Sequence, residues 1–214
     1  MRVDGKTNTI DVNNIIILDC SASMAYAKYN AAKEGIKKEL SLTGELGWRF
    51  SFFEMIDKRH SELRVVTKAD NEYPENVKLS FTGAIGQSTP LCDTLCLIIE
   101  KFINNSTSQK ILLKVFTDGQ DNASTYENKQ RLPELIKKAE KAGFTVVFNC
   151  VESDKQYIKK LGVDPSNINS YKNTGEGMVE AFEVTRTATV AYHKNLVLGN
   201  DVTTGFYNKQ LIKK

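Results

Sequence analysis

The sequence has 214 residues, of which 41% are hydrophobic and 26% charged, and a formal net charge of +3. A chain of this length suits one sizeable domain with its own core, and the composition is ordinary for a globular protein. The lysines are scattered and form no basic stripe with interleaved aromatic residues, which argues against nucleic acid as a partner.

No apolar run approaches the length of a membrane span, and the first ten residues lack the apolar core of a signal peptide. We therefore expect no membrane association and a cytoplasmic location. Cys92 and Cys96 lack the second cysteine or histidine pair that a zinc site needs. We expect the cysteines to be small buried side chains in a reducing compartment rather than a disulfide framework. They are Cys20, Cys92, Cys96 and Cys150.

Short apolar runs and amphipathic segments alternate along the first half of the chain. Gly44 marks the end of the first helical pattern. The short connection DKRHSE between two strand patterns is typical of a hairpin, which predicts one antiparallel edge strand. The predicted elements are strands over residues 12–18, 48–56 and 63–67, and a helix over residues 26–42.

The second half continues this alternation after a polar loop over residues 68–90. Ser124 and Glu127 have the spacing of a capping box, but Pro133 predicts a break in the helix that follows. We expect a short turn there and then a main helix that ends near Ala142. The other predicted elements are strands over residues 110–117, 145–151 and 168–171, and helices over residues 90–104, 153–161 and 177–193.

Strands that alternate with helices predict an α/β fold with a mainly parallel sheet covered on both faces. In such sheets ligands bind beyond the carboxyl ends of the strands, near the point where the strand order reverses. Asp19, one residue past the first predicted strand, therefore stands where a ligand is expected.

Oxygen-bearing side chains gather at this edge of the predicted sheet. Asp19 and Asp118 each follow a buried strand, and the two are neighbours if their strands are adjacent. Ser21 and Ser23 follow Asp19, and Thr89 stands near the N-cap of a later helix. No basic residue lies in these loops, so two facing carboxylates would repel each other unless a cation sat between them. Hard oxygen ligands favour Mg²⁺, Mn²⁺ or Ca²⁺ over zinc.

Three motifs in this order resemble the von Willebrand factor type A domain with an intact metal-ion-dependent adhesion site. DCSAS matches Asp-x-Ser-x-Ser, STPL supplies the threonine, and FTDGQDN supplies the second aspartate. TPLCDTL, FTDGQDNAS and TGEGMVEAFEVT look like signatures of the stand-alone members from bacteria and bacteriophages. The resemblance covers residues 12–193. It implies a Rossmann-like, doubly wound, mainly parallel six-stranded sheet with one antiparallel edge strand and helices on both faces.

The same resemblance implies a domain over residues 1–193 and a tail over residues 194–214 that packs on the domain or extends from it. It also implies roles for the motif residues. The hydroxyls of Ser21 and Ser23 coordinate a divalent ion, which we expect to be Mg²⁺ or else Mn²⁺ or Ca²⁺. Thr89 coordinates it directly or through water. Asp19 and Asp118 supply the negative charge.

Neutral hydroxyl ligands leave such an ion enough positive charge to accept an Asp or Glu carboxylate from a protein partner. The expected function is therefore protein binding, and we expect no enzyme. Stand-alone members of the family often work beside AAA+ ATPases or inside larger assemblies, which implies similar partners. The expected location is the bacterial cytoplasm or, for a phage protein, the host cytoplasm or the virion.

Three other interpretations stay open. Aspartate and serine at a strand-to-helix turn can simply cap the helix, which is also the expected role of Asp121 and Asn122. The chain could be a structural component of a larger assembly, such as a phage particle, with a mainly stabilising metal. A metal-dependent phosphatase or hydrolase could use Asp19 as its nucleophile. Such enzymes usually carry a second acid where this chain has Ser21, and no lysine or histidine accompanies these loops as a base.

Overall fold

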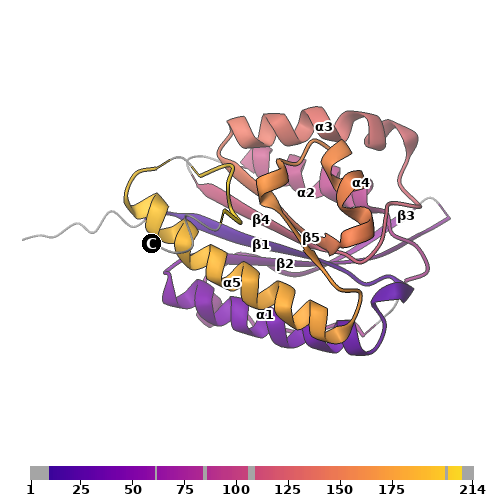
Figure 1. Ribbon diagram of the computed structural model, residues 1–214, viewed down its shortest axis with the longest axis horizontal. Helices are drawn as coiled ribbons and strands as arrows, with labels where there is room; N and C mark the ends of the chain where they lie inside the picture. Colours follow the sequence, from indigo (N-terminus) through magenta and orange to yellow (C-terminus); the bar gives the residue numbers. More distant parts are fainter. Residues whose placement is uncertain (1–9, 61, 84–85, 106–108, 201, 209–214) are drawn as a thin grey trace, which may run out of the picture.

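A mixed six-stranded sheet, in the order β3-β2-β1-β4-β5-β6, runs between two layers of helices (Figure 1). β2 and β3 pair antiparallel and the other neighbouring strands pair parallel, which confirms the predicted fold class. The strands are β1 (Val12–Asp19), β2 (Arg49–Arg59), β3 (Glu62–Glu72), β4 (Lys110–Phe116), β5 (Phe144–Val151) and β6 (Ile168–Tyr171). The computed structural model describes residues 10–60, 62–83, 86–105, 109–200 and 202–208.

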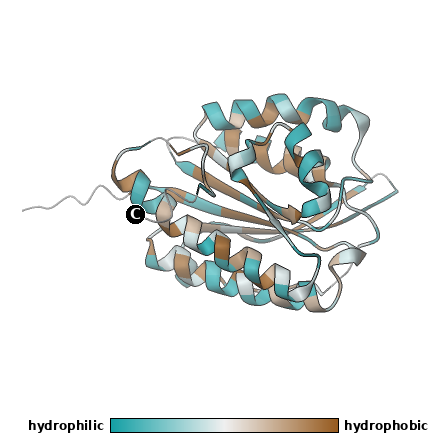
Figure 2. Cartoon of the chain, viewed as in Figure 1, coloured by the Kyte–Doolittle hydropathy of each residue, from teal (hydrophilic) through white to brown (hydrophobic). Residues whose placement is uncertain are grey.

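Helices cover both faces of the sheet, as predicted. One layer holds α1 (Ala27–Glu45) and α5 (Gly175–Val197), and the other holds α2 (Leu91–Asn105), α3 (Tyr126–Lys141) and α4 (Lys155–Lys160). Ile15 and Ile17 of β1 join the core beneath α2 and α3, whereas Ile16 and Leu18 join the core beneath α1 and α5. A strand buried on both faces needs apolar residues at successive positions, which explains the run IIIL. In Figure 2 the strands are mainly hydrophobic and the outer helix faces mainly hydrophilic.

The predicted break at Pro133 is wrong, because α3 runs through this residue without interruption. A proline removes one backbone donor and costs a helix interior about 3 kcal/mol. Leu132 and Ile136, on either side of it, are fully buried in the core beneath the helix, and their burial offsets this cost. Thr125, rather than Ser124, caps the helix by accepting a hydrogen bond from its first turn.

Two other predicted boundaries also move. α1 continues through Gly44, and the chain turns at Gly47, where a φ of +68° favours glycine. β3 extends to Glu72 rather than ending at residue 67, because its backbone pairs with β2 as far as Phe50. This pairing satisfies the backbone groups whatever side chains the strand carries, so the polar stretch KADNE still forms a strand.

The chain after residue 193 takes part in the packing. α5 continues to Val197, and Val202 and Phe206 are buried in one cluster with Trp48, which lies next to the start of β2. This segment therefore packs at the amino edge of the parallel strands, away from the carboxyl edge where Asp19 lies.

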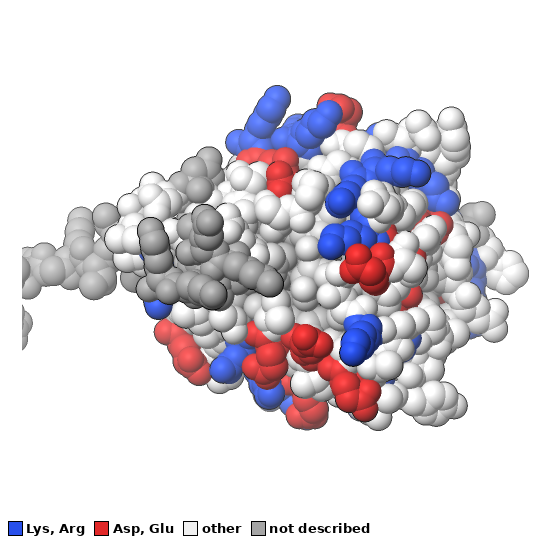
Figure 3. Space-filling model, viewed as in Figure 1, with Lys and Arg blue, Asp and Glu red and all other residues white. Residues whose placement is uncertain are grey.

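Charged side chains of both signs cover the helical layers. On the face in Figure 3, acidic side chains are frequent over the layer of α1 and α5, and basic side chains are frequent over the opposite layer. One exposed ion pair, Lys38 of α1 with Glu183 of α5, links two helices at 2.6 Å. Exposed pairs of this kind contribute about 0–1 kcal/mol. Across the described ranges, the helices are too short or too polar for a membrane span.

A glycine of α1 makes room for an aromatic ring of α5. A Cβ added at Gly35 of α1 would overlap the ring of Phe182 of α5. That ring stacks on Phe116 of β4, with ring centroids 3.9 Å apart and an interplanar angle of 6°. Glycine at position 35 therefore leaves room for the Phe182 ring, so that α1 and α5 can pack side by side on the same face of the sheet.

We predict that Gly35→Ala lowers the free energy of unfolding by about 1–3 kcal/mol, because the new methyl group must displace a packed ring. Gly44→Ala is the matched control on the same helix. Its added Cβ lies 3.5 Å from the Pro74 Cβ, an ordinary contact, so the better helix propensity of alanine raises stability by about 0.5 kcal/mol. Urea unfolding of both variants measures the difference, and equal effects would contradict this packing.

Candidate metal centre

The two aspartates of the predicted site lie at the ends of neighbouring strands. Asp19 is the last residue of β1, and Asp118 follows shortly after the end of β4. β1 and β4 pair parallel, with Leu18 opposite Phe116. The strand order reverses between β1 and β4, because β2 and β3 lie on one side and β5 and β6 on the other. The site therefore stands at the ligand-binding switch point of a doubly wound sheet.

A chain of hydrogen bonds joins four of the five predicted ligand residues. The backbone N of Ser21 donates to Oδ1 of Asp19 at 2.8 Å. The hydroxyl oxygens of Ser21 and Ser23 lie 3.0 Å apart, and the Ser23 hydroxyl donates to Oδ1 of Asp118 at 2.6 Å. These side chains come from two separate connections of the sheet and meet at one place.

The fifth predicted residue, Thr89, points its hydroxyl toward the same place. A Cβ built on Gly119 would lie 3.7 Å from Oγ1 of Thr89 and 3.9 Å from Oγ of Ser23. The two hydroxyls therefore face one small space that the missing side chain of Gly119 leaves free. Thr89 is held there by Asn122, whose Oδ1 accepts a hydrogen bond from the Thr89 backbone N at 2.7 Å and whose own backbone N donates to the Thr89 carbonyl at 3.2 Å.

Most of this site is buried, and it reaches the surface at Ser23. Asp19, Ser21, Thr89 and Asp118 are buried, whereas Ser23 is exposed. In the described part of the chain, no three His, Cys, Asp or Glu side chains gather into a metal-binding group. A metal centre here therefore depends on hydroxyl ligands, and hydroxyl and carboxylate oxygens suit a hard cation.

Asp19 carries its charge in a fully buried position. Burial raises the pKa of Asp19 to about 6, hydrogen bonds from Thr117 and Ser21 oppose this rise, and the charge of Asp118 adds to it. The Thr117 hydroxyl donates to Oδ2 of Asp19 at 2.7 Å. Both carboxylate oxygens of Asp19 are therefore engaged within the protein, and the group is mostly ionised at neutral pH.

A lysine that the sequence analysis missed completes the site. Nζ of Lys28 bonds to Oδ2 of Asp118 and donates to Oδ1 of Asn173 at 2.6 Å. No basic residue lies in the motif loops themselves, but Lys28, the second residue of α1, reaches Asp118 in space. The sequence indicated this contact only by placing Lys28 in the first helical turn after Ser21 and Ser23. The two aspartates therefore already have one cationic partner within the chain.

Gly86 explains how the loop that carries Thr89 approaches the first motif. Its backbone N donates to the Cys20 carbonyl at 2.7 Å, and it forms a parallel bridge with Ser21. A Cβ at this position would overlap the carbonyl of Ile56. Only glycine allows the backbones to come so close, and the glycines of GAIGQSTP were the sequence signal.

The loop after β4 is tied to the start of α2, as expected for turn and cap residues. Oδ2 of Asp121 accepts a hydrogen bond from the Cys92 backbone N at 2.6 Å, and its Oδ1 accepts one from the Ser124 backbone N at 2.9 Å. Burial opposes ionisation of Asp121, but hydrogen bonds from Ser124 and Cys92 hold its pKa below its ordinary value. Asp121 thus fixes the loop that follows Asp118.

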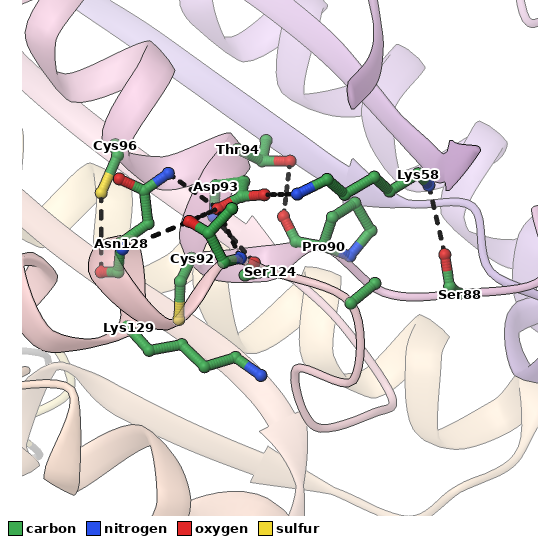
Figure 4. Close-up of polar contacts among 12 residues, drawn as sticks. Lys58, Ser88, Pro90, Cys92, Asp93, Thr94, Cys96, Ser124, Asn128 and Lys129 are labelled. Atoms are coloured by element: carbon green, nitrogen blue, oxygen red, sulfur yellow. Dashed lines mark hydrogen bonds and ion pairs between the residues drawn. The ribbon is translucent and has the colours of Figure 1, made fainter. Parts of the chain in front are cut away.

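Asp93 of α2 joins three elements around the site (Figure 4). One carboxylate oxygen accepts hydrogen bonds from the hydroxyl of Thr125 at 2.9 Å and from Nδ2 of Asn128 at 2.7 Å, and the other bonds to Nζ of Lys58 on β2 at 2.8 Å. The Asp93 backbone N in turn donates to the Ser124 hydroxyl at 2.8 Å. Burial opposes ionisation here, but these hydrogen bonds lower the pKa of Asp93. The Ser124 hydroxyl therefore caps α2 rather than α3.

Comparison with known proteins gives matches among solved structures. No protein-family model matches the sequence, and no curated protein does. Proximal thread matrix protein 1 from the mussel byssus matches with a TM-score of 0.63 and 14% identity over 83% of this chain and 47% of that one. The pilus adhesin SpaC from Lactobacillus rhamnosus GG, in its open conformation, matches with a TM-score of 0.62 and 12% identity over 87% and 31%. The chain thus spans about half the length of the mussel protein and under a third of the adhesin.

The SpRpn10 VWA domain is similar over nearly its whole length, with a TM-score of 0.55 and 10% identity over 79% of this chain and 93% of that one. This chain has the von Willebrand factor A (vWA) fold. The structural matches confirm the resemblance at the level of the fold. The vWA fold explains why residues far apart in the sequence meet at the ends of β1 and β4, whereas their role as metal ligands stays a prediction.

We predict that Mg²⁺ affinity at this site weakens by about tenfold between pH 7 and pH 5, because a proton competes with the ion for Asp19 once the pH falls below the pKa of about 6. Isothermal titration with Mg²⁺ at several pH values measures this. A flat affinity over this range would contradict a role of the Asp19 charge in binding.

Without a divalent ion, in EDTA, lower pH is expected to favour the folded chain, whereas lower pH weakens binding of the ion. Folded Asp19 holds a proton at pH values where an unfolded aspartate, with a pKa of 3.8, has lost it. The contribution of Asp19 to folding therefore becomes more favourable as the pH falls from 7 toward 4. Asp19→Asn, which does not titrate, is the reference for urea unfolding at each pH.

Proposed function

We propose that this chain is a divalent-metal-dependent protein-binding domain, an adhesion or scaffold module rather than an enzyme. The observation that carries the proposal is the convergence of three hydroxyls and two carboxylates on one point of the carboxyl edge, which opens to solvent at Ser23. When bound, Mg²⁺, or Mn²⁺ or Ca²⁺ in its place, would offer a coordination position to an Asp or Glu of a partner protein. The residues that would hold it are Asp19, Ser21, Ser23, Thr89 and Asp118.

The donor chemistry fits such an ion. The Ser21 and Ser23 hydroxyls lie 3.0 Å apart, and the Thr89 hydroxyl faces the same space beside Gly119. The backbone of each contributing loop is fixed by hydrogen bonds to another loop, so these oxygens are positioned before any ligand arrives. Hydroxyl and carboxylate oxygens, rather than thiolate or imidazole ligands, favour Mg²⁺ over zinc.

The similar structures support a divalent ion in this kind of site. Another structure of the mussel matrix protein, with a TM-score of 0.58 to this chain, has zinc in its metal-ion-dependent adhesion site (MIDAS) motif. SpaC is a pilus adhesin. These neighbours support metal-dependent adhesion as the function of the present chain, and the oxygen donors supply the preference for Mg²⁺.

Two exposed tyrosines, each close in sequence to a motif of the site, support a protein as the partner. Tyr26 is 84% exposed and lies just before α1, three residues after Ser23. Tyr126 is 78% exposed and begins α3, after the loop that carries Asp118. Tyrosine is enriched where proteins bind one another, because its ring offers a large contact area with a polar tip.

A hydrolase fits less well. Lys28 reaches the site and could act on a substrate, which removes one argument against catalysis. Asp19, however, is fully buried and uses both carboxylate oxygens within the protein, so it does not reach a substrate as a nucleophile. We therefore propose no catalytic role for these residues.

We predict that Ser21→Ala weakens Mg²⁺ binding at least about tenfold without unfolding the chain, because the variant removes one neutral ligand and no charge. Isothermal titration after removal of divalent ions measures the affinity, with Mn²⁺ as a second probe. Ser41→Ala, at an exposed serine of α1, is the matched control. Equal affinities of wild type and Ser21→Ala would contradict the ligand role.

We predict that partner binding needs both the ion and Asp19. Tagged protein captures its partner from the native lysate in Mg²⁺, loses it in EDTA, and fails to capture it as Asp19→Ala while keeping a folded circular dichroism spectrum. If Asp19→Ala unfolds the chain, the site is structural instead, and if EDTA alone unfolds it, the ion has a structural role. Hydrolysis of a phosphate ester that depends on Mg²⁺ would favour the enzyme instead.

A further inference from the structure

We infer that Lys28 competes with the divalent ion for Asp118 and so sets the ion concentration at which the site loads. This inference rests on the proposed function, because it concerns the same site. The chain would then have a threshold. Partner binding through the ion begins only at a divalent-ion concentration high enough to displace the Lys28 ammonium from Asp118.

Lys28 reaches Asp118 from outside the motif loops. Its Nζ bonds to Oδ2 of Asp118, while the other oxygen, Oδ1, accepts the Ser23 hydroxyl at 2.6 Å. Both oxygens of this carboxylate are therefore engaged, one by a full positive charge. Nζ also donates to Oδ1 of Asn173 in the connection from β6 to α5, which fixes the ammonium beside the site.

This ion pair is shielded from solvent. The side chains of Lys28 and Asp118 are 12% and 0% exposed. Salt and water screen such a pair weakly, so the ammonium acts strongly on any cation nearby. It cancels one of the two negative charges that Asp19 and Asp118 bring to the site. A divalent ion held by the Ser21 and Ser23 hydroxyls would meet both this loss of attraction and direct repulsion.

The position of Lys28 is not explained by the helix that carries it. Lys28 lies in the first turn of α1, where the positive end of the helix dipole disfavours a cation. Its contacts with Asp118 and Asn173 offset that cost. A lysine placed against the preference of its own helix, and aimed at a predicted metal ligand, is better explained by the site than by the helix.

The test measures binding of Mn²⁺ and Mg²⁺ alone by isothermal titration, without a partner. Lys28→Met is expected to bind both ions at least about tenfold more tightly than wild type, because repulsion is lost and the charge of Asp118 becomes available. Lys28→Arg keeps the charge and is expected to stay near wild type. Lys37→Met is the matched control on the same helix, because Lys37 pairs with Glu34 instead and is exposed.

Thermal unfolding supplies a second readout. Without divalent ions, Lys28→Met is expected to unfold at a lower temperature than wild type, because Asp118 loses its partner, and added Mg²⁺ raises its melting temperature more than that of wild type. Lys28→Gln keeps a hydrogen-bond donor and serves if the methionine variant folds poorly.

The outcomes separate this inference from the proposed function. If wild type binds the ions and Lys28→Met binds them equally or more weakly, competition by Lys28 is wrong, and a weaker affinity would mean that Lys28 positions Asp118. If neither wild type nor Lys28→Met binds either ion at millimolar concentration, both the inference and the proposed function are overturned.

Discussion

Two carboxylates set the constraint on which this end of the molecule depends. Asp19 and Asp118 follow adjacent parallel strands at the switch point, so the topology forces them together whatever their charges prefer. Both are buried, and burial together with the charge of Asp118 makes the ionised form of Asp19 costly. The Thr117 hydroxyl donates to Asp19 and reduces that cost, and the Ser23 hydroxyl and the Lys28 ammonium bond to Asp118. A site that must compensate concentrated negative charge is a site that can take a cation.

The loops around these carboxylates are joined to one another by hydrogen bonds. The loop of Thr89 bonds to Cys20 on one side through Gly86 and to Asn122 on the other. The loop after Asp118 bonds to the start of α2 through Asp121, and Asp93 ties that start to β2 and α3 (Figure 4). Asn122 and Asp121 use side-chain oxygens to accept hydrogen bonds from the backbone N–H groups of Thr89 and Cys92. The hydroxyls therefore stand in fixed positions, which lowers the entropy that a ligand must pay to order them.

The sequence predicts best what depends on local pattern. The apolar runs and the motif order were enough for the strands, the antiparallel edge and the meeting of Asp19 with Asp118, because topology rules convert strand ends into neighbours. Prediction failed where a distant contact overrides a local preference. Pro133 stays helical because its neighbours are buried in the core, Ser124 serves a helix other than the one it precedes, and Lys28 crosses from α1 to a loop far along the chain. None of these contacts can be recognised from the periodic pattern of apolar and polar residues in the sequence.

Helix α1 is fastened to β4 by two ion pairs of opposite polarity. Lys28 bonds to Asp118 just beyond the strand, and Glu39 bonds to Lys114 within it at 2.7 Å, with both of these side chains almost fully buried. Lys28 and Glu39 are about 16 Å apart along the helix, and Lys114 and Asp118 about 13 Å apart along the extended chain, so helix and strand run alongside each other in matching register. The Glu39–Lys114 pair, the packing of Gly35 on Phe182 and the buried residues Ala32 and Ile36 hold α1 on the sheet without Lys28. Lys28 can therefore exchange Asp118 for another partner while the helix stays where it is, which is what competition with an ion requires.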